Sequence, residues 1–287
     1  MGGTVYNGHQ GRTRRVVRRR SSTAEFGAIP NSNPAGETLI PISVQLYTIR
    51  DQTSNDFATA MKAVAAIGYP SVELAGYGNL KTAKEARKAL DAAGLKVAGA
   101  HAPIEQLETN VEKVLDDAEI VGTKIIVCPF LPEPRRKDAE GWKQVAKSLN
   151  AAGRAAHERG IELAYHNHSF EFQQFEGKTG LDILFDNSDS HLVKAEIDVY
   201  WVEHGGEDPV QRINKLGERV IALHLKDMAS GPEKRFAEVG TGILDFKSIL
   251  AAGEKSRVKF GAVEQDNCYG KPTLEAIRTS FENLKKM

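Results

Sequence analysis

From residue 39 onward, short apolar runs rich in β-branched residues alternate with longer amphipathic stretches. The short runs have the length and composition of buried strands, and the stretches between them have the period of helices. The eight predicted strands are Ile42–Thr48, Ser71–Ala75, Val97–Ala102, Lys124–Phe130, Ile161–Tyr165, Val193–Val199, Val220–Lys226 and Lys259–Gln265. The predicted helices are Asp56–Ile67, Lys81–Ala93, Ile104–Val121, Ala139–Arg159, Gly180–Phe185, Asp208–Lys215, Phe246–Ala252 and Thr273–Lys286.

Strict alternation of strands and helices predicts a parallel sheet with right-handed crossovers. Eight such units favour closure into a barrel, and 287 residues suffice for one. An open nucleotide-binding sheet would need a glycine-rich turn after its first strand, but LYTIRDQTSND stands there. The predicted fold class is therefore α/β, a single (β/α)8 TIM barrel over residues 39–287, without a nicotinamide cofactor.

The N-terminal residues differ from the rest in composition. Residues 1–37 contain six Arg and two Glu, a net charge of +4, so the rest of this neutral chain sums to −4. We predict a disordered or loosely attached basic tail over residues 1–38 and an acidic body that does not bind nucleic acid. No apolar segment follows the arginines or reaches the length of a membrane span, which favours a cytoplasmic protein. A transit peptide stays open as an alternative.

Polar residues recur where the predicted strands end. His166 and His168 share one face of a strand because side chains alternate along it, and Asp198, His224 and Glu264 end the next three strands. The carboxyl ends of barrel strands meet at one face of the barrel, where active sites lie. Two carboxylates and two imidazoles form a mixed site suited to Mn²⁺, Co²⁺, Zn²⁺ or Mg²⁺. Separate ion pairs around the rim are the alternative.

Eight short motifs in barrel order carry a resemblance to a known family. They are SVQLYTIRD, GYPSVELAGY, AGAHAP, ELAYHNHSFEF, EIDVYW, LHLKDM, VGTGILDF and VEQDN. The chain resembles the xylose-isomerase-like sugar phosphate isomerase/epimerase superfamily, which includes ketose 3-epimerases, inosose dehydratase and, more distantly, endonuclease IV. The resemblance implies one divalent metal, Mn²⁺ or Co²⁺ first, held by His166, Asp198, His224 and Glu264. His168 is the alternative ligand on the fifth strand.

The resemblance also implies removal of a proton α to a carbonyl. Epimerases of this group usually carry Glu at the position of His166, whereas the HLKD run is more similar to inosose dehydratase. The expected function is a metal-dependent sugar or cyclitol isomerase or epimerase, with a dehydratase or lyase on a keto-sugar or keto-inositol as the alternative. An endonuclease IV-like nuclease and a non-catalytic sugar-binding barrel are further alternatives.

Each candidate residue has an expected role in this chemistry. Glu264 is the first candidate base and also a ligand, and a positioned acid must then supply a proton. The candidates for that acid are Lys226, His168 and Glu171, those for binding sugar hydroxyls are Glu73 and His101, and those for apolar walls are Tyr47 and Trp201. The expected partner is a small sugar or cyclitol, and a homo-oligomer stays open.

Overall fold

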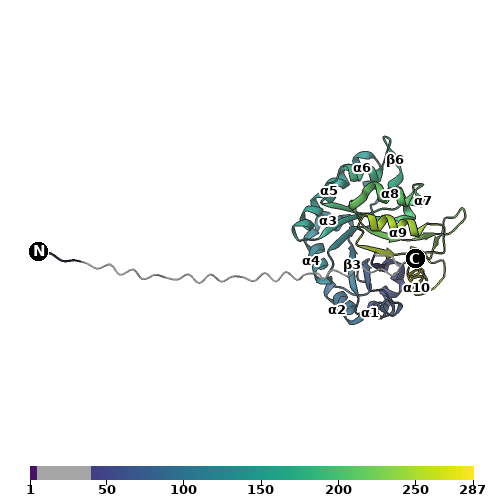
Figure 1. Cartoon of the computed structure of the whole chain (residues 1–287), viewed down its shortest axis with the longest axis horizontal. Helices are drawn as coiled ribbons and strands as arrows, with labels where there is room; N and C mark the ends of the chain where they lie inside the picture. The colour runs from purple at the N-terminus through teal and green to yellow at the C-terminus, as the bar shows by residue number, and fades with distance from the viewer. Residues whose placement is uncertain (5–39) are drawn as a thin grey trace. The chain divides into compact units, whose positions relative to one another are not determined.

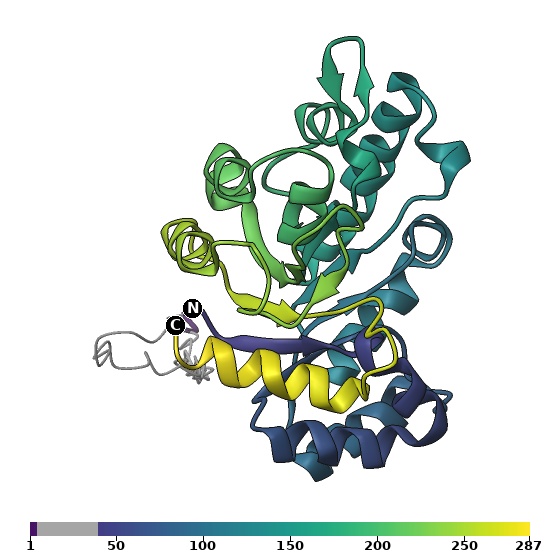
Figure 2. The same ribbon diagram turned by 90° about the vertical axis from the view of Figure 1, so that its right-hand side faces the viewer.

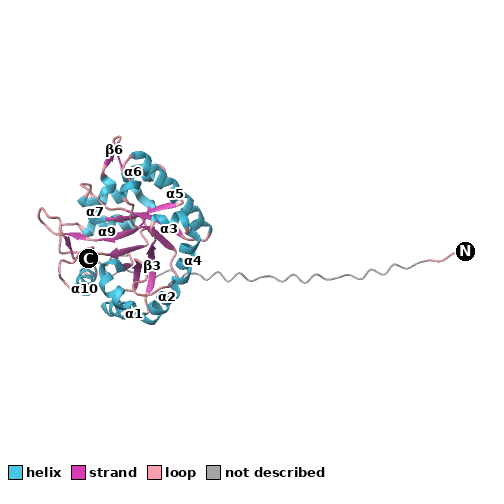
Figure 3. Cartoon of the chain, turned by 180° about the vertical axis from the view of Figure 1, so that it is seen from behind, coloured by secondary structure: helices cyan, strands magenta, loops and turns pink. Residues whose placement is uncertain are grey.

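The computed structural model describes residues 1–4 and 40–287, so the predicted basic tail falls almost wholly outside the described residues. From residue 40 the chain forms a closed parallel barrel in the order β1-β2-β3-β4-β5-β8-β9-β12 (Figure 1). Each predicted strand forms one strand of the barrel, and helices surround the strands (Figure 3). The predicted (β/α)8 barrel is confirmed.

The barrel strands are β1 (Ile42–Gln45), β2 (Ser71–Leu74), β3 (Lys96–His101), β4 (Ile125–Cys128), β5 (Glu162–His166), β8 (Val193–Asp198), β9 (Val220–Leu225) and β12 (Phe260–Val263). The helices are α1 (Arg50–Ile67), α2 (Ala83–Ala93), α3 (Ile104–Thr109), α4 (Val111–Val121), α5 (Ala139–Glu158), α6 (Gly180–Asp186), α7 (Val199–His204), α8 (Pro209–Leu216), α9 (Phe246–Lys255) and α10 (Thr273–Leu284). Two hairpins, β6 (Gln174–Phe175) with β7 (Lys178–Thr179) and β10 (Asp227–Met228) with β11 (Phe236–Ala237), lie outside the barrel sheet.

Three helices differ from the prediction. The backbone of α1 leaves helical geometry at Asp56, whose carboxylate accepts a hydrogen bond from the Thr59 amide at 3.1 Å, so the predicted helix start is an internal cap. The predicted helix Ile104–Val121 is divided at Asn110, which has φ −145° and ψ 35°. The short helix α7 directly after β8 was not predicted. It starts because Asp198 accepts a hydrogen bond from the Trp201 amide.

Two apolar clusters build the molecule. A small one fills the lower barrel interior and consists of Ile125, Val127, Ala164, Ile221, Ala222, Phe260 and Ala262. A much larger one lies between the strands and the surrounding helices. The C-terminal helix α10 closes the ring beside α1 and the last strand, β12 (Figure 2). The upper barrel interior, at the carboxyl ends of the strands, contains charged residues instead.

The loop after β9 is held by one buried carboxylate. Asp227 accepts hydrogen bonds from the amides of Met228 (2.7 Å), Gly240 (3.0 Å), Gly242 (2.8 Å) and Leu244 (3.2 Å). A Cβ at Gly242 would overlap the Met228 carbonyl oxygen and this carboxylate. The VGTGILDF motif is therefore accounted for by loop geometry. In the described part of the chain, no helix is both long and apolar enough to cross a membrane.

Candidate active site

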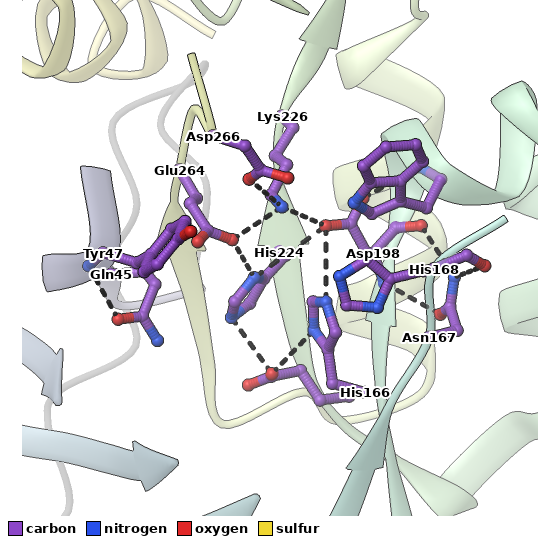
Figure 4. Close-up of polar contacts among 12 residues, drawn as sticks. Gln45, Tyr47, His166, Asn167, His168, Asp198, His224, Lys226, Glu264 and Asp266 are labelled. Carbon is purple, nitrogen blue, oxygen red and sulfur yellow. Dashed lines mark hydrogen bonds and ion pairs between the residues drawn. The ribbon is translucent and has the colours of Figure 1, made fainter. Parts of the chain in front are cut away.

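The four residues expected to hold a metal lie together at the carboxyl ends of β5, β8, β9 and β12 (Figure 4). Glu264 Oε2 lies 2.7 Å from His224 Nδ1, and Asp198 Oδ2 lies 3.9 Å from the same nitrogen. His166 Nε2 lies 3.8 Å from Asp198 Oδ2. Asp198, His224 and Glu264 each offer a ligand atom within 4.8 Å of the others, so these three residues could hold one ion.

The opposite nitrogen of His224 faces two buried carboxylates. His224 Nε2 lies 2.6 Å from Glu73 Oε2 and 3.0 Å from Glu196 Oε2. This pairing keeps a proton on Nε2 and turns Nδ1 towards Asp198 and Glu264. Glu73 has no exposed surface and also accepts a hydrogen bond from Gln45 at 2.8 Å. Glu73 thus contacts the histidine rather than the open cavity, where it was expected to bind sugar hydroxyls.

Glu196 is a site residue that the sequence reasoning missed. Its Oε2 lies 3.1 Å from His166 Nδ1 and 3.4 Å from His101 Nε2. With His101, His166 and His224 it forms a second group of ligand atoms within 4.8 Å of one another. The signal was present in the EIDVYW motif, because Glu196 precedes Asp198 by two residues and so shares its face of β8.

Lys226 is 1% exposed and joins three carboxylates. Its Nζ lies 2.6 Å from Asp266 Oδ1, 2.7 Å from Glu264 Oε2 and 3.0 Å from Asp198 Oδ2 (Figure 4). Burial disfavours the charged ammonium, but the three carboxylates outweigh it and hold the pKa of Lys226 well above its ordinary value. This lysine therefore stays protonated and serves as a hydrogen-bond donor, not as a base.

Acidic groups outnumber basic groups in the cluster. Its carboxylates are Glu73, Glu196, Asp198, Glu264 and Asp266, and the groups whose pKa favours the cation are His101, His224 and Lys226. Burial would raise the pKa of Glu264, but Lys226 and His224 lower it below its ordinary value. Burial raises the pKa of Asp198 to about 6 despite the nearby Lys226 charge. With all five carboxylates ionised, the excess negative charge suits a divalent cation.

His168 and Glu171 occupy different surroundings from His166. The His168 ring stacks on Phe170, with centroids 5.4 Å apart, and burial together with the Lys226 charge lowers its pKa to about 3. In the described part of the chain, His168 belongs to neither group of ligand atoms. Glu171 is wholly buried, where it accepts hydrogen bonds from the Tyr165 hydroxyl at 2.7 Å and the His168 amide at 2.8 Å. Glu171 thus fixes the loop that carries His168.

A cavity of about 880 Å³ opens above the cluster, and His101, His166, His168, Lys226, Glu264 and Asp266 contribute to its wall. Tyr47 and Phe130, which are 44% and 47% exposed, also line it. Arg50 holds Tyr47 in place, because its guanidinium lies 4.2 Å from the ring centroid and donates to the Tyr47 and Asp266 carbonyl oxygens. Phe130 lies two residues after β4 and was not among the expected site residues.

Trp201 lies beside the cluster. Its ring centroid is 5.5 Å from that of His168, and Lys226 Nζ lies 5.8 Å from the Trp201 centroid. The indole Nε1 has no hydrogen-bond partner among the described residues. Trp201 therefore packs against two residues of the cavity wall without lining the cavity itself, and its expected role as an apolar wall stays a prediction.

Comparison with known proteins agrees with the fold. The inosose dehydratase of Clostridium beijerinckii (strain ATCC 51743 / NCIMB 8052) is 26% identical over 263 residues, covering 78% of this chain and 87% of that protein. A sugar phosphate isomerase/epimerase from Parabacteroides distasonis ATCC 8503 superimposes with a TM-score of 0.76 at 23% identity, covering 90% of this chain and 96% of that one. The 3-keto-D-glucoside 4-epimerase of E. coli superimposes with a TM-score of 0.66 at 18% identity, covering 86% and 100%. The family model described as "Xylose isomerase-like TIM barrel" matches residues 61–258, and the chain belongs to this family.

Proposed function

We propose that the protein is a divalent-metal-dependent enzyme that removes the proton α to the carbonyl of a keto-sugar or keto-cyclitol. The observation that carries the proposal is the convergence of Asp198, His224 and Glu264 within 4.8 Å at the mouth of the barrel, with Lys226 bridging the two carboxylates. A carboxylate base beside a fixed ammonium suits proton transfer at carbon next to a carbonyl.

The donor set fits a divalent cation. His166, Asp198, His224 and Glu264 would supply imidazole and carboxylate ligands, a combination that suits Mn²⁺, Co²⁺ or Zn²⁺ and accommodates Mg²⁺ less well. His166 is preferred over His168 because its Nε2 faces Asp198, whereas His168 lies on Phe170. A bound cation would act as a Lewis acid towards the carbonyl oxygen of the substrate.

Residues around the proposed metal site would transfer protons and bind the substrate. Burial would raise the pKa of Glu264, but the Lys226 and His224 charges lower it, so this carboxylate is ionised, as a general base must be, although the same charges weaken its basicity. Lys226 donates a hydrogen bond to the oxygen that gains negative charge or protonates a departing hydroxyl. His101, at the cavity wall, binds a ring hydroxyl. Glu73 and Glu171 orient His224 and the His168 loop, respectively.

Two outcomes can follow proton removal, and we propose isomerisation or epimerisation as the first. In that reaction the proton returns to the same carbon from the other face or to the neighbouring carbon. The alternative is loss of a β-hydroxyl as water. An inosose dehydratase among the relatives keeps this alternative open, as does His166, which stands where epimerases of this family usually carry Glu. Both reactions share the proton abstraction assigned to Glu264.

The test measures bound metal and proton abstraction from the substrate in two separate experiments. Protein purified without added metal is analysed by mass spectrometry, as are the His166→Ala and His168→Ala variants. We expect about one equivalent of divalent metal in the wild type and in His168→Ala, and loss of metal in His166→Ala. Keto-inositol and methyl 3-keto-glucoside are then incubated in D₂O, and NMR measures deuterium at the carbon next to the carbonyl.

The two readouts separate the parts of the proposal. Deuterium exchange followed by a new stereoisomer supports epimerisation, whereas exchange followed by an unsaturated product supports dehydration. Wild-type protein that binds no metal even after incubation with Mn²⁺ or Co²⁺ refutes the metal site. Metal binding without exchange on any keto-sugar or keto-cyclitol instead points to a non-catalytic sugar-binding barrel.

A further inference from the structure

The cavity above the cluster continues away from it into an apolar crevice. We call this part the α4 crevice, and its walls are Leu74, Ala100, Val114, Ala118, Val121 and Ile126. Ile126 alternates with Ile125 and Val127, which belong to the cluster inside the barrel, so Ile126 points outward. The α4 crevice therefore lies between helix α4 and the outer face of β2, β3 and β4. The polar cluster and the α4 crevice line one and the same cavity.

Ordinary packing does not leave such a space between a barrel strand and its helix, because protein interiors contain few voids larger than a water molecule. Two features of the chain open it. Ala100 and Ala118 are small, and the break at Asn110 ends α3 before α4 begins. From Val114 to Val121 helix α4 rises roughly 10 Å, which is the length of one or two rings. The whole cavity, at about 880 Å³, is near the upper end of the roughly 300–1,000 Å³ typical of ligand sites.

We propose that the substrate carries an uncharged apolar substituent, such as an aryl or alkyl aglycone, that binds in the α4 crevice while its sugar ring lies at the polar cluster. This inference rests on the proposed function, since it takes the cluster as the sugar site. A single monosaccharide leaves the α4 crevice empty, whereas a glycoside fills both parts of the cavity. The exposed rings of Tyr47 and Phe130 line the same cavity and offer apolar contacts to the linkage.

The charges around the cavity exclude an anionic substituent. Among the described residues of the cavity wall there is no arginine, and both lysines are already paired. Lys113 Nζ lies 2.7 Å from Asp117 Oδ2, and Lys226 holds three carboxylates. A phosphate or carboxylate on the substituent would therefore meet no unpaired cation in the described cavity wall, and the Asp117 carboxylate would repel it.

The experiment compares two sugars that cannot react because they lack a carbonyl. Calorimetry measures the binding of methyl and phenyl β-D-glucopyranoside to metal-loaded protein. Burial of a phenyl ring in an apolar pocket should tighten binding roughly tenfold or more relative to the methyl glycoside. In Ala118→Leu, whose added carbons fill the α4 crevice, this preference should fall to about twofold or less.

A matched control makes the same change elsewhere. Ala151→Leu lies on the exposed face of α5 and should keep the wild-type preference. Val114→Phe narrows the crevice from a second position and replaces Ala118→Leu if that variant does not fold, as judged by its thermal midpoint. The wild-type comparison needs no variant.

Each other outcome overturns the inference in a recognisable way. Equal binding of both glycosides refutes the aglycone site and leaves the proposed sugar site standing. A phenyl preference that survives in folded Ala118→Leu and Val114→Phe places the ring elsewhere. If neither glycoside binds, the inference fails, and deuterium exchange on the keto-sugars decides the proposed function separately.

Discussion

Replacement of Glu264 by Gln tests the base most directly. The carboxylate contacts His224 Nδ1 and Lys226 Nζ, each at 2.7 Å, and Gln keeps one accepting oxygen but loses the charge and the basicity. A general base contributes roughly 10²- to 10⁴-fold, so the activation barrier should rise by about 3–5 kcal/mol. We expect deuterium exchange at the α carbon to fall by that factor.

Folding should change much less than exchange. Lys226 keeps Asp198 and Asp266 as partners, so loss of the Glu264 charge should cost about 1–2 kcal/mol of unfolding free energy. For a domain of this size that is a fall of roughly 2–8 °C in thermal midpoint. Asp266→Asn is the control, because it removes another carboxylate from Lys226 at a side chain that is 24% exposed. Its exchange rate should fall by about tenfold or less.

The assay follows deuterium incorporation by NMR in keto-inositol and methyl 3-keto-glucoside, with metal content measured for each variant. Comparison at equal metal occupancy separates loss of the base from loss of the ion. If Glu264→Gln exchanges within tenfold of the wild type while it holds metal, Glu264 is not the base. If Asp266→Asn loses more exchange than Glu264→Gln, the base has been assigned to the wrong carboxylate.

Three further predictions concern single contacts. Lys226→Met removes the cation that pairs with the proposed metal ligands Asp198 and Glu264, so metal binding in a chelator competition should become about tenfold tighter. Unchanged or weaker binding would show that Lys226 does not compete with the metal for these carboxylates. Gly242→Ala places a Cβ against the Met228 carbonyl oxygen and should lower the unfolding free energy by about 1–3 kcal/mol in urea, whereas a stability equal to wild type would show that the loop adapts. Burial would raise the pKa of Asp182, but hydrogen bonds from Lys215 and Arg212 outweigh burial and lower this pKa. The ionised carboxylate therefore stabilises the fold above the pKa of an unfolded Asp, near 4, and this contribution is lost as the pH falls below that value. Asp182→Asn should therefore be about 1–2 kcal/mol less stable than wild type at pH 7, with a smaller gap at pH 3; a gap that widens in acid would refute the assignment.

The sequence was sufficient for the barrel because its strands are buried on both faces and separated by helices with a clear period. It was less informative about where helices break. Ile104–Val121 has a continuous apolar stripe, and nothing in its composition marks Asn110 as non-helical, since one Asn costs a helix little. The division there depends on how α3 and α4 pack on different parts of the barrel. Tertiary contacts of this kind are not visible in a local pattern.

For the site, too, the sequence indicated which residues come together but not the tertiary contacts that they make. The carboxyl ends of parallel strands necessarily converge, so His166, Asp198, His224 and Glu264 could be grouped from the strand pattern and the family resemblance together. The direction in which each of these side chains points could not be predicted in the same way. Glu73 was expected near the substrate because a lone carboxylate in an apolar strand needs a polar partner, and Glu171 was expected as an acid. Glu73 instead contacts His224 from across the barrel, and Glu171, in the turn after β5, accepts a hydrogen bond from Tyr165. A carboxylate's partner across the barrel depends on the tilt and stagger of the strands.

The buried charges themselves argue that this end of the barrel was shaped for chemistry. Ion pairs inside a protein rarely stabilise it more than apolar residues of similar volume would, because each charge loses its hydration. At the lower end of the same barrel, Ile125, Ala222 and Phe260 fill the interior with no such cost. At the upper end, five carboxylates surround three basic groups, and with all five ionised the surplus of negative charge weakens the fold unless a cation is bound. A divalent ion would therefore be expected to raise the thermal midpoint as well as to enable turnover, so stability against added Mn²⁺ and chelator reports on the site independently of any substrate.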